Sequence, residues 1–151
     1  MNTNFLLCNN ENSMADKLSE LHSRCFSSPT EKYSSKSIAE FLDNKNYQVL
    51  ANDACLGIIK FVKPEAEIIT IAVDPQFRNR RYGSKLLNRL IRIAKKERIN
   101  EIFLEVSINN SVAKKLYQNA GFCQIGHRKN YYRLNEISNA DAILMHLEIK
   151  Y

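Results

Sequence analysis

The middle of the chain switches twice between a strand pattern and a helix pattern, and this restricts the fold more than any other feature. Residues 67–73 alternate as a strand that Asp74-Pro75 ends, residues 82–98 follow a helical period, and residues 101–107 form a second apolar strand. A helix that connects two parallel strands of one sheet does so by a right-handed crossover. The sequence therefore predicts a sheet that contains one parallel pair.

Further elements surround this unit. Apolar residues at helical or alternating spacing predict helices over 14–26, 35–42 and 111–120 and strands over 47–51, 55–62, 122–133 and 142–149. This order predicts the α/β (α+β) class, with a mixed sheet flanked by helices. No repeat or Pro/Gly/Ser-rich linker divides the 151 residues, so we expect residues 1–151 to form a single domain.

Composition excludes several classes of protein. No apolar run approaches the ~18 residues that a membrane helix needs, and apolar residues 5–8 are too few for a signal peptide. The four cysteines lack a metal-ligand spacing, which is typical of a reduced, cytoplasmic chain. The three histidines share no spacing typical of a metal site or a triad, so we interpret them as structural. We expect a cytoplasmic protein without a metal site.

The positive charge is concentrated in one segment. Residues 78–98 contain nine basic residues and one acid, so this segment carries +8 and the rest carries −2 of the net +6. Such a run is often only the solvated face of a helix. The alternative is a bound anion, either nucleic acid or a small polyphosphate.

The loop over residues 78–84 precedes the basic helix and includes its first turn. The first turn of a helix has unpaired N–H groups and the positive end of the helix dipole, which together suit a phosphate group. Gly83 would let a ligand approach the backbone closely. Strand–loop–helix turns with one glycine are common, so the loop is an anion site only in combination with the charge that follows it.

Glu105 interrupts an otherwise apolar strand. An ionised carboxylate in such a place is destabilising unless it is paired, hydrogen-bonded or functional. A structural salt bridge is one explanation. General-base catalysis is the other, because desolvation raises a carboxyl pKa toward the range that suits a base.

Asn110 and Tyr117 lie seven residues apart, about two helical turns, so both face the same side of one helix. Asn110 suits the N-cap of this helix, and Gly121 suits a left-handed residue just after it. A helical tyrosine is more often at the edge of a core than an acid catalyst. Both interpretations stay open on these residues alone.

Several motifs together resemble the GNAT acetyltransferase superfamily. They are Ile71-Ala72-Val73-Asp74-Pro75, the 78–84 loop, Leu104-Glu105-Val106, and Asn110, Ala113, Leu116-Tyr117 and Gly121-Phe122. Arg128-Lys129-Asn130-Tyr131-Tyr132 and Asp141-Ala142-Ile143-Leu144-Met145 resemble one branch, the ribosomal-protein-alanine N-acetyltransferases of RimI type. The resemblance covers residues 67–145, whereas the first 60 residues resemble the branch only loosely.

The resemblance implies a mixed, mainly antiparallel sheet whose two central parallel strands splay apart. Acetyl-CoA, as co-substrate, would lie in the gap along Ile71, Ala72 and Val73, and the N–H of Val73 would polarise the thioester carbonyl. The pyrophosphate would bind the amides of Asn79, Arg80, Arg81, Tyr82, Gly83 and Ser84. Asn110 would also contact the cofactor, and the basic segment is where a polyanion would be held.

The resemblance also implies the chemistry. Glu105 would be the general base and Tyr117 the general acid that protonates the departing thiolate. Tyr131 and Tyr132 would line the groove for the acceptor peptide, with Tyr33 where this branch often has Trp. The implied partner is the N-terminal segment of a small-subunit ribosomal protein that begins with alanine, without a membrane or a specific nucleic acid.

Besides Tyr33, two positions depart from the family pattern, and two other hypotheses stay open. Arg81 replaces the first glycine of the family's pyrophosphate motif, so a positive φ there would cost about 1–2 kcal/mol. Ala140 replaces an acid that is common in the branch. The chain could instead acetylate a Lys side chain or a small amine. A catalytically weak CoA-binding or nucleic-acid-associated module is the other hypothesis.

Overall fold

The structure is a computed structural model that describes residues 4–11, 13–28, 31–134 and 138–151. Its elements are β1 (Leu6–Leu7), α1 (Met14–Cys25), α2 (Ser35–Asp43), β2 (Tyr47–Ala51), β3 (Cys55–Val62), β4 (Glu65–Val73), the 3₁₀ turn η2 (Pro75–Phe77), α3 (Tyr82–Lys96), β5 (Glu101–Ser107), α4 (Ser111–Asn119), β6 (Cys123–Arg133) and β7 (Asn139–Glu148). The strands form one sheet in the order β1-β2-β3-β4-β5-β7-β6. Its only parallel pair is β4–β5, within the described residues.

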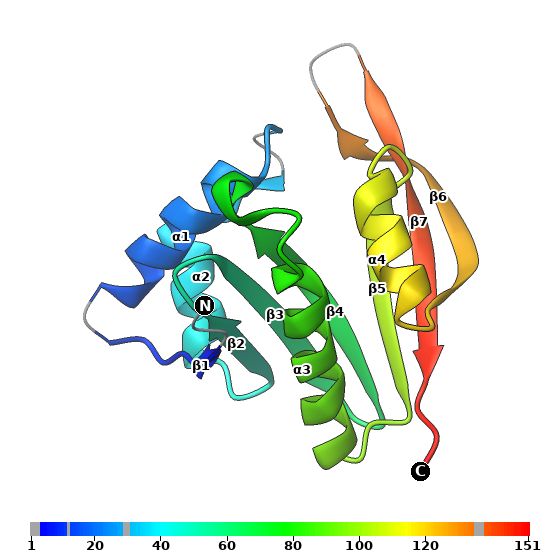
Figure 1. The fold of residues 1–151 in the computed structure, drawn as a ribbon, viewed down its shortest axis with the longest axis horizontal. Coiled ribbons are helices and arrows are strands. Elements are labelled where there is room, and N and C mark those ends of the chain that lie inside the picture. The colour runs from blue at the N-terminus through cyan, green and yellow to red at the C-terminus, as the bar shows by residue number, and fades with distance from the viewer. Residues whose placement is uncertain (1–3, 12, 29–30, 135–137) are drawn as a thin grey trace.

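Helices cover both faces of the sheet (Figure 1). On one face, the apolar stripe of α3 packs against β3, β4 and β5, and Leu86, Leu87 and Leu90 are fully buried there. On the other face, α1 and α2 bury Leu18, Leu21 and Ile38. As its 3.6-residue period predicts, α3 buries its apolar face in the core and exposes its charged face.

The two parallel strands separate part-way along their length. Their pairing extends from Glu65 opposite Glu101 to Ile68 opposite Leu104, and β4 then continues to Val73 without pairing to β5. Figure 1 shows the gap between the two ribbons widening toward the end where β5 leads into α4. The predicted mixed, mainly antiparallel sheet with a splayed parallel pair is thus confirmed.

A bulge in β4 accompanies this separation. Ile58 pairs with Thr70 and Ile59 pairs with Ile68, so Ile69 has no partner on β3. A bulge shifts the two-residue alternation of a strand by one position. As a result Ile68 packs against α3, whereas Ala72 packs on the α1 side.

Most predicted elements are present, with differences at their ends. The strand β1 was not predicted, because two exposed residues at a sheet edge give no alternating pattern. The strand β7 begins at Asn139 rather than at residue 142, since its polar start pairs with the end of β6. No helix among the described residues has the length and apolar character needed to cross a membrane.

Candidate active site

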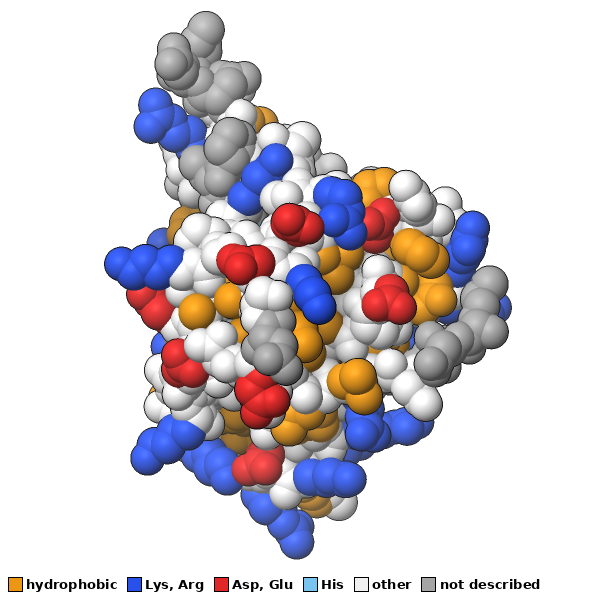
Figure 2. Space-filling model, turned by 90° about the vertical axis from the view of Figure 1, so that its left-hand side faces the viewer, with side chains coloured by type: hydrophobic (Ala, Val, Ile, Leu, Met, Phe, Trp, Pro, Cys, Tyr) orange, Lys and Arg blue, Asp and Glu red, His pale blue; other side chains and the backbone are white. Residues whose placement is uncertain are grey.

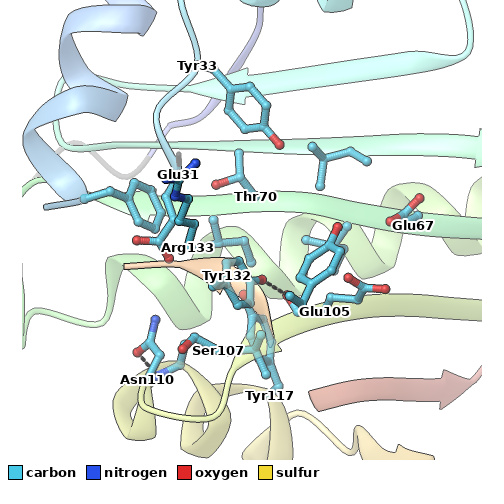
Figure 3. A pocket seen from close by; sticks show the side chains of 17 residues that line it. Glu31, Tyr33, Glu67, Thr70, Glu105, Ser107, Asn110, Tyr117, Tyr132 and Arg133 are labelled. Atoms are coloured by element: carbon cyan, nitrogen blue, oxygen red, sulfur yellow. Dashed lines mark hydrogen bonds between the residues drawn. The ribbon is translucent and has the colours of Figure 1, made fainter. Parts of the chain in front are cut away.

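A pocket of about 480 Å³ lies where β4 and β5 separate. Seven of the residues predicted from the sequence line it: Ile71, Glu105, Asn110, Tyr117, Tyr131, Tyr132 and Tyr33. Figure 3 shows Tyr33 entering from the loop before α2 and Tyr117 entering from α4, on opposite sides of the pocket. The fold therefore brings together residues that are up to 99 positions apart in the sequence.

The carboxylate of Glu105 has two different oxygen environments. Oε1 accepts a hydrogen bond from Nη1 of Arg128 at 2.7 Å. Oε2 is buried and has no hydrogen-bond partner among the described residues. The ion pair agrees with the structural explanation of Glu105, but an unpartnered buried oxygen is destabilising unless a donor arrives from elsewhere.

Tyr117 and Asn110 face the same pocket, as their spacing predicts. The Asn110 side chain caps α4 by accepting a hydrogen bond from the N–H of Ala113 at 3.1 Å. Tyr117 is 6% exposed and packs edge-on against Phe122. Burial raises the pKa of Tyr117 above its ordinary value, so its hydroxyl keeps its proton at neutral and mildly basic pH.

Besides Tyr117, three tyrosines line the pocket, from two separate parts of the chain. Tyr131 and Tyr132 contact each other edge-on, with ring centroids 5.1 Å apart, and the Tyr132 hydroxyl donates to the Glu105 carbonyl at 3.4 Å. Tyr33 packs against the ring of the buried His22 at 5.0 Å. The ring of His22 also stacks on Phe26 and hydrogen-bonds Thr70 through Nε2 at 3.0 Å. His22 is thus a structural histidine that supports one wall of the pocket.

The buried His22 makes stability depend on pH. Burial lowers its pKa to about 4, whereas an unfolded histidine takes up its proton near pH 6.5. Between these values the unfolded chain binds the extra proton, so the free energy of unfolding should fall by about 3 kcal/mol as the pH drops from 6.5 to 4. Urea unfolding at stepped pH measures this slope. A His22→Gln variant should show a clearly shallower slope, and an equal slope in both proteins would contradict the assignment.

The predicted phosphate loop has the expected helix start. Tyr82 begins α3, and Arg81 precedes it at φ 62°, in the left-handed region where the family motif has glycine. The side chain of Arg81 makes no capping hydrogen bond to the helix. The amides of the first turn of α3 are therefore not capped by that side chain, which is the arrangement that suits an anionic group.

The basic segment is exposed, and its side chains form no close ion pairs among the described residues. All nine of its Lys and Arg side chains are exposed. None of them takes part in an ion pair with a carboxylate among the described residues. On the side of α1 and α2, by contrast, Figure 2 shows acidic and basic side chains intermixed. The positive excess is therefore concentrated along α3 and the loop that precedes it.

The sequence analysis gave no role in the site to several polar residues at or next to this pocket. Glu67 and Glu31 line it directly. Arg128 pairs with Glu105, and Asp141 pairs with His127 at 2.6 Å on the neighbouring strands. Glu67 alternates with buried Ala66 and Ile68, which is the ordinary pattern of a half-exposed strand and gives no signal of function.

Comparison with known proteins identifies the family. Residues 15–122 match the sequence model of the Acetyltransferase (GNAT) family. The chain belongs to this family. It is 38% identical to the [Ribosomal protein bS18]-alanine N-acetyltransferase of Haemophilus ducreyi over 104 residues, which are 69% of this chain and 72% of the relative.

Solved structures agree with this assignment. The ribosomal-protein-S18-alanine N-acetyltransferase of Escherichia coli superposes with a TM-score of 0.83 at 27% identity, over 98% of this chain and 96% of that one. Arabidopsis thaliana NAA60, solved in complex with acetyl-CoA, shares the fold at a TM-score of 0.84 and 17% identity, over 97% and 98% of the two chains. This GNAT chain is therefore an acetyltransferase, and the prediction of enzyme class is confirmed.

Proposed function

We propose that this GNAT chain, as one domain over residues 1–151, transfers an acetyl group from acetyl-CoA to the N-terminal α-amine of a protein. The proposed acceptor is the N-terminal alanine of a small-subunit ribosomal protein, the acceptor that the names of its relatives specify. The main support for this proposal is that a candidate base and a candidate acid lie in one pocket. The same pocket holds the Glu105 carboxylate, with one buried unpartnered oxygen, and the protonated Tyr117 hydroxyl.

The residues around the pocket fit acetyl-CoA, which when bound supplies an acetyl thioester. The side chain of Arg81 does not cap the backbone amides in the first turn of α3. The exposed Lys and Arg side chains of the basic segment belong to the same loop and helix. Beyond Ile68, the side of β4 that faces β5 has no strand partner, so its backbone groups suit a ligand that carries amides. Ile71 and Asn110 line the pocket and Val73 ends β4, which supports the cofactor contacts that the resemblance implies for them.

The two proton-handling groups divide the chemistry between them. Oε2 of Glu105 accepts the proton that the acceptor amine loses as it attacks, either directly or through one water molecule. A peptide α-amine has a pKa of about 7.7–8.0, against ~10.4 for Lys, so an N-terminal acceptor gives up its proton more readily than a Lys side chain does. Tyr117 keeps its proton until the thiolate leaves and then donates it.

The aromatic side chains of the pocket support a peptide acceptor. Tyr131 is 45% exposed at the pocket mouth, while Tyr132 and Tyr33 are half-buried behind it. Aromatic rings offer wide apolar contact, and their hydroxyls offer hydrogen bonds to a peptide backbone. A chain that enters between these tyrosines would bring its first residue to Glu105. Such a groove favours an N-terminal segment over a small free amine.

Cofactor binding should depend on the two arginines of the phosphate loop. Replacing Arg80 and Arg81 together by Gln should raise the Kd for acetyl-CoA by about 10-fold at low salt, because charge-assisted contacts to phosphate are lost. The difference should shrink as salt rises, since screening already weakens these contacts in the wild type. Calorimetric titration measures both effects.

A matched control removes the same charge farther along α3. Arg92 and Lys96 are exposed and lie outside the loop, so Arg92→Gln with Lys96→Gln should change the Kd far less. An unchanged Kd in the Arg80/Arg81 variant at low salt would contradict a pyrophosphate site in this loop.

A panel of short peptides tests the proposed function. Each peptide carries a different first residue, and the release of CoA thiol is followed with acetyl-CoA in excess. Peptides that begin with alanine should be acetylated, while the same peptides with a blocked N-terminus should not react. Activity on a blocked peptide that contains Lys, without activity on the free N-terminus, would favour the Lys-directed alternative.

A further inference from the structure

Arg128 contacts two residues that line the pocket, Glu105 and Tyr131, and the proposed chemistry gives it no role. Its guanidinium donates to Oε1 of Glu105 at 2.7 Å. The same group lies over the ring of Tyr131, 4.0 Å from the ring centroid. Arg128 is thus fixed between the candidate base and a side chain of the acceptor groove.

The local shape of β6 places Arg128 there. Arg128 pairs with Ala142 and Tyr132 pairs with Ala140, so three residues of β6 lie opposite the single residue Asp141. The Asp141 carboxylate closes this irregularity by accepting from the N–H of Asn130 at 2.8 Å and by pairing with His127. Such a bulge redirects the side chains around it.

The contact makes the two oxygens of Glu105 unequal. A carboxylate held at one oxygen by a charge-assisted hydrogen bond loses much of its freedom to rotate. Oε1 is the held oxygen, and Oε2 is the buried one without a partner among the described residues. Burial and the nearby Glu105 carboxylate raise the pKa of Tyr131, so the protonated Tyr131 hydroxyl lies near this carboxylate, and Oε2 is its oxygen without a hydrogen bond among the described residues.

We propose that Arg128 is a positioning residue, which holds Oε1 of Glu105 so that Oε2 receives the proton of the acceptor amine. This inference rests on the proposed function. Arg128 itself does not bind the cofactor or accept a proton. An ordinary surface ion pair is the competing explanation, because the Arg128 side chain is 55% exposed and such pairs contribute little to stability.

A double-mutant cycle separates these explanations. In the full chain, Arg128→Gln should lower kcat on an alanine-starting peptide by about 10-fold, with an unchanged Kd for acetyl-CoA. In a Glu105→Gln background, Arg128→Gln should change kcat by less than about 2-fold. The reason is that Arg128 acts through Glu105, and the Gln at position 105 no longer accepts a proton. Arg128→Lys should recover part of the lost activity. Lys129→Gln, on the same strand and exposed, removes the same charge and should leave kcat unchanged.

Each other outcome overturns the inference. Equal losses in both backgrounds would mean that Arg128 acts independently of Glu105. A rise in the KM for the peptide at constant kcat would make Arg128 a peptide-binding residue, and no loss in the wild-type background would make the pair structural only. Acetyl-CoA affinity and thermal unfolding show whether each variant is folded. A wild-type chain that acetylates no N-terminal amine would overturn the proposed function as well, and this result is distinct from the others.

Discussion

Replacing Glu105 with Gln is expected to lower kcat by roughly 10²–10⁴-fold, the usual effect of losing a general base. The substitution keeps the shape of the side chain and removes its ability to accept a proton. Because Gln can still accept a hydrogen bond from Arg128 at its amide oxygen, the strand should keep its structure. Steady-state kinetics with an alanine-starting peptide measures the loss, and acetyl-CoA titration confirms that the variant is folded.

Two carboxylates serve as controls for this experiment. Glu101 lies on the same strand but its side chain is 41% exposed beside His146, so Glu101→Gln should keep the wild-type kcat. Glu67 lines the pocket and is the competing candidate for the base. A large loss in Glu67→Gln, together with normal activity in Glu105→Gln, would contradict the assignment of the base.

Tyr117→Phe is expected to have the second-largest effect, a fall in kcat of about 10²-fold. The change removes only the hydroxyl, and the ring can still pack against Phe122. Since burial keeps the hydroxyl protonated, its loss should affect protonation of the leaving thiolate more than binding of the peptide. The same kinetics should therefore show a fall in kcat with little change in the KM for the peptide.

Tyr47→Phe is the matched control for this second prediction. Tyr47 lies on β2, packs against Phe41 and is not among the residues that line the pocket. Its loss of a hydroxyl should leave kcat unchanged. Equal activity of Tyr117→Phe and Tyr47→Phe would remove Tyr117 from the chemistry and leave it as a core residue.

Periodicity was sufficient to predict most of the fold. The stripe that contains Leu86 and Leu90 follows the helical period because these side chains are fully buried against the sheet. The crossover from β4 through α3 to β5 could be predicted for the same reason. Edge positions carry no such signal, so the two exposed residues of β1 and the polar start of β7 were missed.

The candidate site was predictable only where a residue conflicted with its surroundings or matched a family motif. Glu105 stood out as an acid in an apolar strand, and the resemblance supplied roles for it and for Tyr117. The partner of Glu105 could not be predicted, because Arg128 reaches it only through the irregular pairing of β6 with β7. That geometry depends on contacts between residues far apart in the sequence, which spacing alone does not show.

We propose above that this GNAT chain acetylates an N-terminal α-amine at the pocket between β4 and β5. The most direct test of this proposal is tandem mass spectrometry of a peptide that begins with alanine and also contains an internal lysine, after incubation with acetyl-CoA and either the wild type or Glu105→Gln. We expect one acetyl group on the α-amine of the first residue with the wild type, and far less product with the variant. An acetyl group on the lysine with an unmodified N-terminus, or equal α-amine acetylation by both proteins, would contradict the claim.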